Sequence, residues 1–155
     1  MHCTAPIPEP PRLPKRQCGT STISRLVVGS EPGDVAVARR WSAQVSHAGV
    51  RLARDVATVV SELVTNSHRH TASGLPGGST RVEIERTPFQ VVIRVSDDGP
   101  RPGEQHIPFP RMTDPEPLAV GGYGLRIVDT LALYWDWAGD AGGPLTVRAV
   151  LDRSP

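Results

Sequence analysis

Residues 52–71, LARDVATVVSELVTNSHRHT, decide the fold of this 155-residue chain. Apolar residues and one serine recur there at intervals of three and four positions, which is the spacing of one face of an α-helix. The members of this stripe are Val56, Val59, Val60, Leu63 and Ser67. The opposite side carries polar residues such as Arg54 and Arg69. The segment is therefore predicted to be a long amphipathic helix with one face on a core.

Three polar residues, Glu62, Asn66 and His70, border this stripe and share one side of the helix, because each is four positions from the next. A carboxylate and an amide at the rim of a buried face are costly without partners. The glutamate can deprotonate a nucleophile, and the asparagine can offer its carbonyl oxygen to a hard cation such as Mg²⁺. Taken alone, the spacing of these three residues favours an ordinary polar side of the helix that faces solvent.

The rest of the chain alternates between the periods of strands and helices. Apolar alternation predicts five strands, at residues 22–28, 81–86, 90–97, 134–138 and 145–151. One further helix is predicted to start at Ser30-Glu31-Pro32 and to stop near Gly49, and another follows Gly124. This order predicts an α/β (α+β) two-layer sandwich with a mixed, mostly antiparallel sheet.

The strand VVIRVSD ends in Asp97, which is followed by Asp98, Gly99 and Pro100. Strand alternation places Asp97 on the same inward face as the preceding valines and isoleucine, so it is expected to be half-buried at the edge of the core. A carboxylate there can accept a hydrogen bond from the exocyclic amine of adenine, and Gly99 allows the backbone to approach the base. Taken alone, an Asp-Gly sequence is also typical of an ordinary turn after a strand.

A glycine-rich run, Gly121–Gly124, opens the next helix, where free backbone N–H groups can converge on phosphate oxygens. It lacks the Gly-Lys-Ser/Thr of a Walker loop, and Ile127 occupies the position of the third glycine of a dinucleotide fingerprint. The preceding residues 98–120 are rich in proline and show no helix or strand period. A loop of this length is predicted to be a lid or binding loop.

In combination, these segments resemble a known family. ELVTNSHRHT (62–71), VSDDGPRPG (95–103) and GGYGLRIVD (121–129) resemble, in order and spacing, the N, G1 and G2 boxes of the GHKL, or Bergerat-fold, ATPases. This family includes DNA gyrase, sensor histidine kinases, heat-shock chaperone ATPases and MutL-type repair proteins. The likeness covers residues 22–151 and is closest to the small anti-sigma-factor serine/threonine kinases and their actinobacterial relatives.

The resemblance implies a Bergerat fold, with helices on one face of the sheet, that binds ATP and Mg²⁺. It makes Asn66 the Mg²⁺ ligand and Glu62 the catalytic general base, acting on a serine hydroxyl or a water. It also implies a set of nucleotide-binding residues. They are Asn66, His70, Asp97, Gly99, Gly122, Gly124, Leu125, Arg126 and Thr146.

Within that set, the resemblance assigns Asp97 to the adenine amino group, with Gly99 beside the base. Gly122 and Gly124 would wrap the phosphates, and Thr146 would help Asp97 hold the adenine through a water. The role of His70, at the end of the N box, is left open.

One position departs from the pattern, because Arg101 stands where the G1 box usually has its last glycine. This arginine stiffens and charges the start of the 98–120 segment. Lys15 is the only lysine, so charge for the phosphates must come from Mg²⁺ and arginines, and Arg101, Arg111 and Arg126 are the candidates.

Composition excludes several other classes. The formal net charge of +1 argues against direct nucleic-acid binding, and no apolar run reaches the roughly 20 residues of a membrane helix. Cys3 and Cys18 are the only cysteines, so neither a disulfide scaffold nor a zinc site is predicted. We expect a cytoplasmic protein, with a flexible proline-rich tail at residues 1–20 and an ATPase domain at residues 21–155.

Two functions remain open at this point. The first is a serine/threonine kinase that phosphorylates an antagonist protein and sequesters a sigma factor, and Glu62 favours it because a pure binder needs no base. The second is a non-catalytic module whose nucleotide state gates a protein interface, and the departure at Arg101 favours it. The resemblance also suggests a homodimer, formed through the sheet edge near Thr22–Val28.

Overall fold

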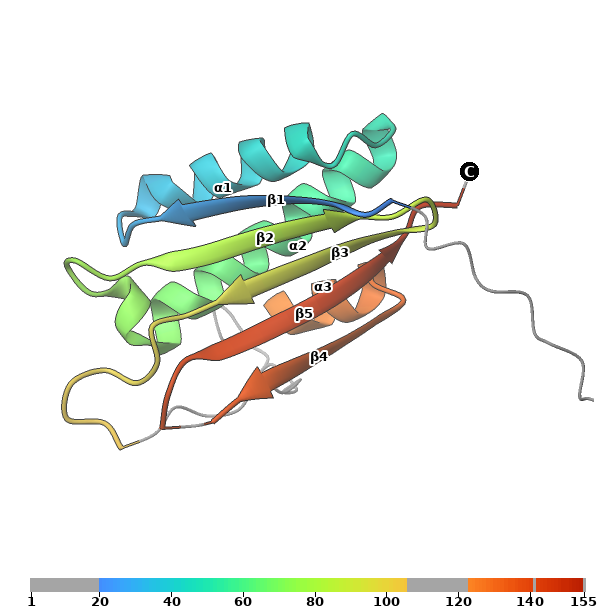
Figure 1. The fold of residues 1–155 in the computed structure, drawn as a ribbon. Helices are drawn as coiled ribbons and strands as arrows, with labels where there is room; N and C mark the ends of the chain where they lie inside the picture. Colours follow the sequence, from blue (N-terminus) through green and yellow to red (C-terminus); the bar gives the residue numbers. More distant parts are fainter. Residues whose placement is uncertain (1–19, 106–122, 141, 155) are drawn as a thin grey trace, which may run out of the picture.

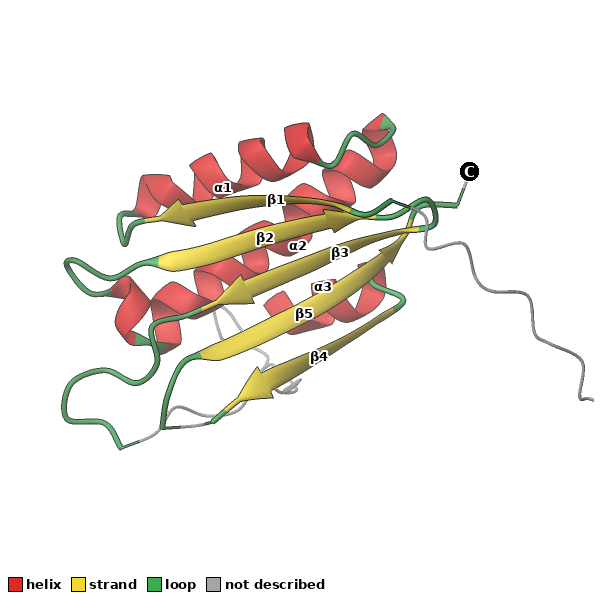
Figure 2. Cartoon of the chain, in the orientation of Figure 1, coloured by secondary structure: helices red, strands yellow, loops and turns green. Residues whose placement is uncertain are grey.

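The computed structural model describes residues 20–105, 123–140 and 142–154. One antiparallel sheet forms the first layer, and helices cover one of its faces as the second (Figure 1). The helices are α1 (Pro32–Val45), α2 (Val50–His70) and α3 (Gly124–Leu131). The strands are β1 (Thr22–Val28), β2 (Thr80–Arg86), β3 (Gln90–Ser96), β4 (Tyr134–Gly139) and β5 (Leu145–Asp152). The predicted two-layer sandwich with helices on one face is confirmed (Figure 2).

The strands lie in the order β1-β2-β3-β5-β4. All four pairings between them are antiparallel, so no parallel pair occurs among the described strands, although a mixed sheet was expected. The connection from β3 through α3 does bring β4 back parallel to β3. However, β5 inserts between these two strands and pairs with both of them.

The core lies between α2 and the middle of the sheet. All five residues of the predicted stripe are buried, together with Val64. They pack against the inward side chains of β2 and β3, and burying an aliphatic side chain of this size contributes about 1.5–3 kcal/mol. The buried hydroxyl of Ser67 is satisfied by the hydroxyl of Thr80 at 2.7 Å. The position and orientation of α2 therefore follow from this one face.

Helix α1 begins as predicted but ends earlier. Glu31 and Asp34 form a reciprocal capping box at its start, and a proline occupies the first turn. The helix stops at Val45 because His47 has a positive φ of 45°, a backbone conformation that no helix continues through. Gly49, expected near the end of α1, instead caps the start of α2.

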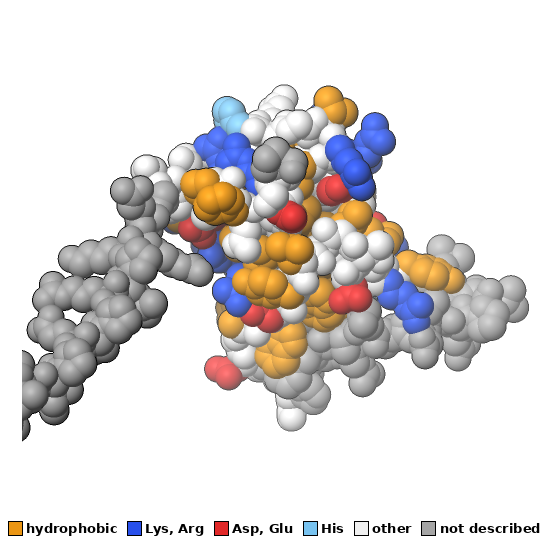
Figure 3. All heavy atoms as spheres, turned by 90° about the vertical axis from the view of Figure 1, so that its right-hand side faces the viewer, with side chains coloured by type: hydrophobic (Ala, Val, Ile, Leu, Met, Phe, Trp, Pro, Cys, Tyr) orange, Lys and Arg blue, Asp and Glu red, His pale blue; other side chains and the backbone are white. Residues whose placement is uncertain are grey.

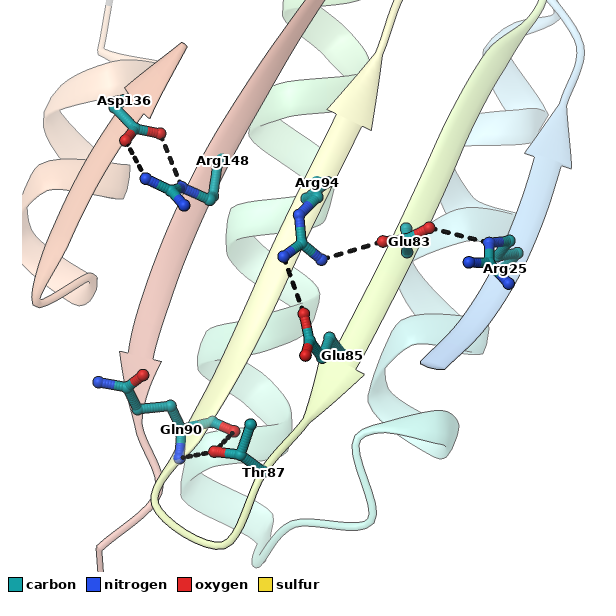
Figure 4. Close-up of polar contacts among 8 residues, drawn as sticks. All are labelled: Arg25, Glu83, Glu85, Thr87, Gln90, Arg94, Asp136 and Arg148. Carbon is teal, nitrogen blue, oxygen red and sulfur yellow. Dashed lines mark hydrogen bonds and ion pairs between the residues drawn. The ribbon is translucent and has the colours of Figure 1, made fainter. Parts of the chain in front are cut away.

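The face of the sheet away from the helices carries rows of ion pairs (Figure 4). Glu83 accepts hydrogen bonds from Arg25 and Arg94, each at 2.9 Å, and Arg94 also pairs with Glu85 at 2.8 Å. On β5 and β4, the guanidinium of Arg148 donates two hydrogen bonds to the carboxylate of Asp136. This open face is charged and solvated, so a site that shields a ligand from water belongs on the helix side or at the strand ends.

The two ends of the sheet differ in character. At the end with the β2–β3 turn, apolar and charged side chains are interspersed on the surface (Figure 3). The opposite end, where β3 stops and β5 begins, carries the Asp97 turn. Within the described ranges, none of the helices is both long and apolar enough to cross a membrane.

Candidate functional site

Glu62 and Asn66 face the first turn of α3. A Cβ atom placed on Gly124 would lie 2.8 Å from Glu62 Oε2 and 3.5 Å from both Oδ1 and Nδ2 of Asn66. A side chain at position 124 would therefore force the carboxylate of Glu62 to move. Because Gly124 has none, the start of α3 lies directly against the two polar side chains, and the structure brings these three predicted residues together.

Asp97 follows β3 and is half-buried, as strand alternation predicted. Its Oδ1 accepts hydrogen bonds from the N–H groups of Gly99 at 2.7 Å and Leu145 at 3.1 Å. No hydrogen bond from the described residues reaches its second oxygen, Oδ2. The carboxylate therefore keeps one oxygen for a further donor.

Burial is the largest influence on Asp97 and raises the pKa of its carboxyl above the usual range. The N–H groups of Leu145 and Gly99 act in the opposite direction, and the negative charge of Asp98 adds to the rise in pKa. The ionised carboxylate is thus held in place at a cost in folding free energy. Strained or costly groups of this kind cluster at functional sites.

Gly99 is required for two reasons. Its φ of +84° lies in the region that residues with a side chain avoid, and an added Cβ would lie 3.0 Å from the carbonyl carbon of Gly143. Its carbonyl oxygen accepts a hydrogen bond from Ala72 N at 2.8 Å. Ala72 begins the 3₁₀ turn Ala72–Gly74 that follows α2, so the Asp97 turn is attached to the end of that helix.

Asp98 attaches the same turn to the loop before β2. Its carboxylate accepts hydrogen bonds from the backbone N–H of Ser79 at 2.6 Å and from the Ser79 hydroxyl at 3.2 Å. Its own N–H donates to the hydroxyl of Ser73 at 2.9 Å. Sequence reasoning assigned Ser73 and Ser79 only to a loop, because no local pattern shows which side chain they will meet.

Thr146 does not lie with the carboxylate of Asp97. Its hydroxyl shares a 2.7 Å hydrogen bond with the hydroxyl of Ser96, its partner in the sheet register. Ser96 precedes Asp97 by one residue, so Ser96 and Thr146 point to the open face while Asp97 points to the helices. The neighbouring Leu145 contacts Asp97 instead, through its N–H. Alternation in β5, with Ala149 and Leu151 buried inward, is the signal that predicts this orientation.

Arg101 was a candidate cation for the phosphates, but its guanidinium lies on the end of α2. Nη2 donates to the carbonyl oxygens of Arg69 at 2.6 Å and His68 at 3.3 Å, and Nε donates to that of Thr71 at 3.2 Å. Nearby, His70 is exposed at the end of α2. Burial, and then the positive charges of Arg69 and Arg101, lower the pKa of His70.

The remaining predicted residues are placed less fully. Leu125 packs against the core from α3, and Arg126 is exposed on the same helix. Gly122, Arg111 and most of the 98–120 segment lie outside the described residues, so their roles stay predictions. In the described parts of the chain no group of three His, Cys, Asp or Glu side chains could hold a metal ion. A single amide ligand such as Asn66 still fits Mg²⁺, which commonly takes one or two protein oxygens plus phosphates and waters.

The fold and this constellation define the class of the GHKL, or Bergerat-fold, nucleotide-binding domains. The chain belongs to the histidine kinase-like ATPase domain family, whose sequence pattern matches residues 28–149. It is also similar to proteins named serine-protein kinase RsbW from Listeria innocua serovar 6a and Listeria monocytogenes serotype 4a. Each is 34% identical over 91 residues, a stretch that covers 53% of this chain and 58% of the Listeria protein.

Proposed function

We propose that this chain is an ATP-dependent serine/threonine protein kinase of the anti-sigma-factor type, which phosphorylates an antagonist protein. The observation that carries the proposal is the placement of Glu62 and Asn66 against Gly124. The proposed base, the proposed metal ligand and the start of a helix suited to phosphates would thus lie within one small region. The similarity to proteins named serine kinases supports the same assignment.

In the proposed mechanism the free oxygen of Asp97 accepts a hydrogen bond from the adenine amino group and orients the nucleotide. Mg²⁺ held by Asn66 would neutralise charge on the phosphates. Glu62 takes the proton from a serine or threonine hydroxyl while the hydroxyl oxygen bonds to the γ-phosphorus. The bond from that phosphorus to the bridging oxygen breaks, and ADP leaves with that oxygen.

The second candidate is a non-catalytic module in which bound nucleotide only gates a protein interface. The arginine at position 101 favours it, because its guanidinium is engaged by backbone carbonyls and is not available to phosphates in this conformation. Both candidates bind ATP, so phosphoryl transfer separates them.

The test uses the wild-type protein with ATP labelled at the γ-phosphate and an antagonist protein encoded beside its gene. We expect Mg²⁺-dependent ATP binding in calorimetry and transfer of label to a serine or threonine of the antagonist. Absence of transfer, together with antagonist or sigma-factor binding that still depends on ATP, would contradict the kinase and support the gated module. Absence of ATP binding would contradict both.

We also propose that the protein forms a homodimer through β1. Among the strands that the structure describes, β1 lies at one edge of the sheet and pairs with β2 alone, so one side of its backbone can offer N–H and C=O groups to another chain. Ile23 and Val27 are 40% and 59% exposed beside that edge. Light scattering at tens of micromolar is expected to give a dimer mass, and Val27→Lys is expected to give a monomer, because an edge lysine opposes pairing. A monomeric wild type would refute this assembly.

A further inference from the structure

The carbonyl end of α2 is capped by a side chain from a distant part of the chain. The last carbonyl groups of a helix have no partner within the helix and carry the negative end of its dipole. Thr71 satisfies Ser67 O, with its N–H at 3.2 Å and its hydroxyl at 2.7 Å. Arg101, which lies 32 residues beyond Arg69, takes the carbonyl oxygens of His68 and Arg69 and that of the capping residue Thr71.

Arg101 directly follows the turn that holds Asp97 and Gly99. This turn already has two neutral attachments to the segment after α2, from Ala72 N to Gly99 O and from Asp98 N to Ser73 Oγ. Arg101 adds charged hydrogen bonds from its guanidinium to carbonyl groups of α2 itself. Its three donor contacts span one turn of backbone, which the planar guanidinium can reach and a single ammonium cannot match.

These contacts join the two halves of the site. Helix α2 carries Asn66 about one turn and Glu62 about two turns before the capped end. The Asp97 turn carries the carboxylate proposed for adenine. We propose that Arg101 is a positioning residue, which clamps the Asp97 turn to the carbonyl end of α2 and so fixes the spacing between Asp97 and Asn66 before nucleotide binds. The effect of this clamp on ATP affinity rests on the proposed function, whereas the existence of the clamp does not.

A fixed spacing affects ATP affinity through the fraction of molecules that are ready to bind. The apparent dissociation constant equals the intrinsic constant divided by that fraction. If the freed turn is correctly placed about one tenth of the time, affinity falls about tenfold. Once nucleotide is bound, the spacing is set by the ligand, so the rate at saturating ATP should change little. A glycine, the usual residue at this position of the G1 box, has no side chain to make the clamp.

The experiment compares wild type with Arg101→Ala, Arg101→Lys and the control Arg153→Ala. Arg153 is matched in kind, because it also donates to backbone carbonyls, those of Thr87 and His47. It lies after β5, at the end of the sheet away from Asp97. Circular dichroism establishes that each variant is folded, and Arg101→Lys, which keeps the charge, preserves the test if Arg101→Ala does not fold.

The first measurement is hydrogen exchange without nucleotide. In Arg101→Ala the amides of Ala72 and Gly99 are expected to exchange at least about tenfold faster, because the end of α2 and the turn open locally. The exchange rates of these amides in Arg101→Lys are expected to lie between those of wild type and Arg101→Ala, and those in Arg153→Ala to equal the wild-type rates. NMR titration gives a second signature: the pKa of His70 rises in Arg101→Ala, because the arginine charge that lowers it is gone, and the lysine variant restores it.

The second measurement is ATP affinity and steady-state kinetics. Arg101→Ala is expected to raise the Kd and KM about tenfold with an unchanged kcat, and Arg101→Lys to recover part of the loss. Unchanged exchange and an unchanged His70 pKa would overturn the clamp, whatever the protein does with ATP. Faster exchange with wild-type affinity would overturn the positioning role. A wild type that does not bind ATP would refute the proposed function and the positioning role with it, while the exchange data would still decide the clamp.

Discussion

Glu62→Gln is expected to lower the rate of phosphoryl transfer by about 10²–10⁴-fold while ATP affinity changes only a few-fold. The amide has nearly the shape of the carboxylate but cannot take a proton from the attacking hydroxyl. This loss corresponds to about 2.7–5.5 kcal/mol of transition-state stabilisation. Binding should survive because Asn66 and Asp97, the residues proposed for metal and adenine, are untouched.

The geometry around Glu62 allows rate and affinity to be separated in this way. Its Oε2 lies against the first turn of α3, 2.8 Å from the position that a Cβ of Gly124 would occupy. Asn66 stands one helical turn further along α2, which places their Cβ atoms about 5–6 Å apart. The base can thus reach a hydroxyl next to the γ-phosphate while the amide holds the metal.

The measurement is single-turnover transfer of labelled phosphate to the antagonist, with calorimetry for ATP. Glu85→Gln is the matched control, because this glutamate lies on the open face and pairs with Arg94. It should transfer at the wild-type rate. Robust transfer by Glu62→Gln would remove Glu62 from the mechanism, and the general base would have to be sought elsewhere.

The sequence was sufficient for most of the fold, because burial in this chain follows clean periods. Every member of the stripe predicted within residues 52–71 is buried, and β2 and β3 alternate between buried and more exposed positions. The strand pairing is harder to predict, since the local pattern of β4 does not show that β5 will separate it from β3. The end of α1 depends on the positive φ of His47, a conformation that is uncommon in residues other than glycine and that no local pattern marks here.

Predictability of the site depended on how local each interaction is. The i, i+4 spacing on α2 and the inward position of Asp97 follow from helix and strand geometry alone, and the structure agrees with both. Thr146 was assigned by resemblance, without applying the alternation that turns its side chain to the other face. Arg101 was a candidate for the phosphates because the only lysine is Lys15, so that the positive charge had to come from Mg²⁺ and arginines. Its partners are carbonyls about thirty residues earlier, which only the three-dimensional path brings within reach.

Asp97→Asn is expected to weaken ATP binding about 10- to 100-fold, because a hydrogen bond to a charged group contributes about 1.5–3 kcal/mol. The amide oxygen can keep the hydrogen bonds from Gly99 and Leu145 that Asp97 Oδ1 accepts. The side-chain nitrogen then replaces Oδ2, so a donor faces the adenine amino group, itself a donor. Calorimetry measures the loss, and Asp152→Asn, at the far end of the sheet, should bind like wild type.

The same substitution should leave the nucleotide-free protein at least as stable as wild type at neutral pH. Burial raises the pKa of Asp97 in the folded state, so the folded protein holds the proton more tightly than the unfolded chain does. Ionised Asp97 therefore lowers stability as pH rises from the ordinary carboxyl range through the raised pKa, and the amide of the variant has no such dependence. Urea unfolding of both proteins across this range should show that the variant's free energy of unfolding rises relative to that of wild type as pH increases, and that the difference then levels off.

A variant that loses stability at neutral pH and binds ATP normally would make Asp97 a structural residue rather than the adenine acceptor. Loss of affinity with undiminished stability is the signature of a costly carboxylate retained for its ligand.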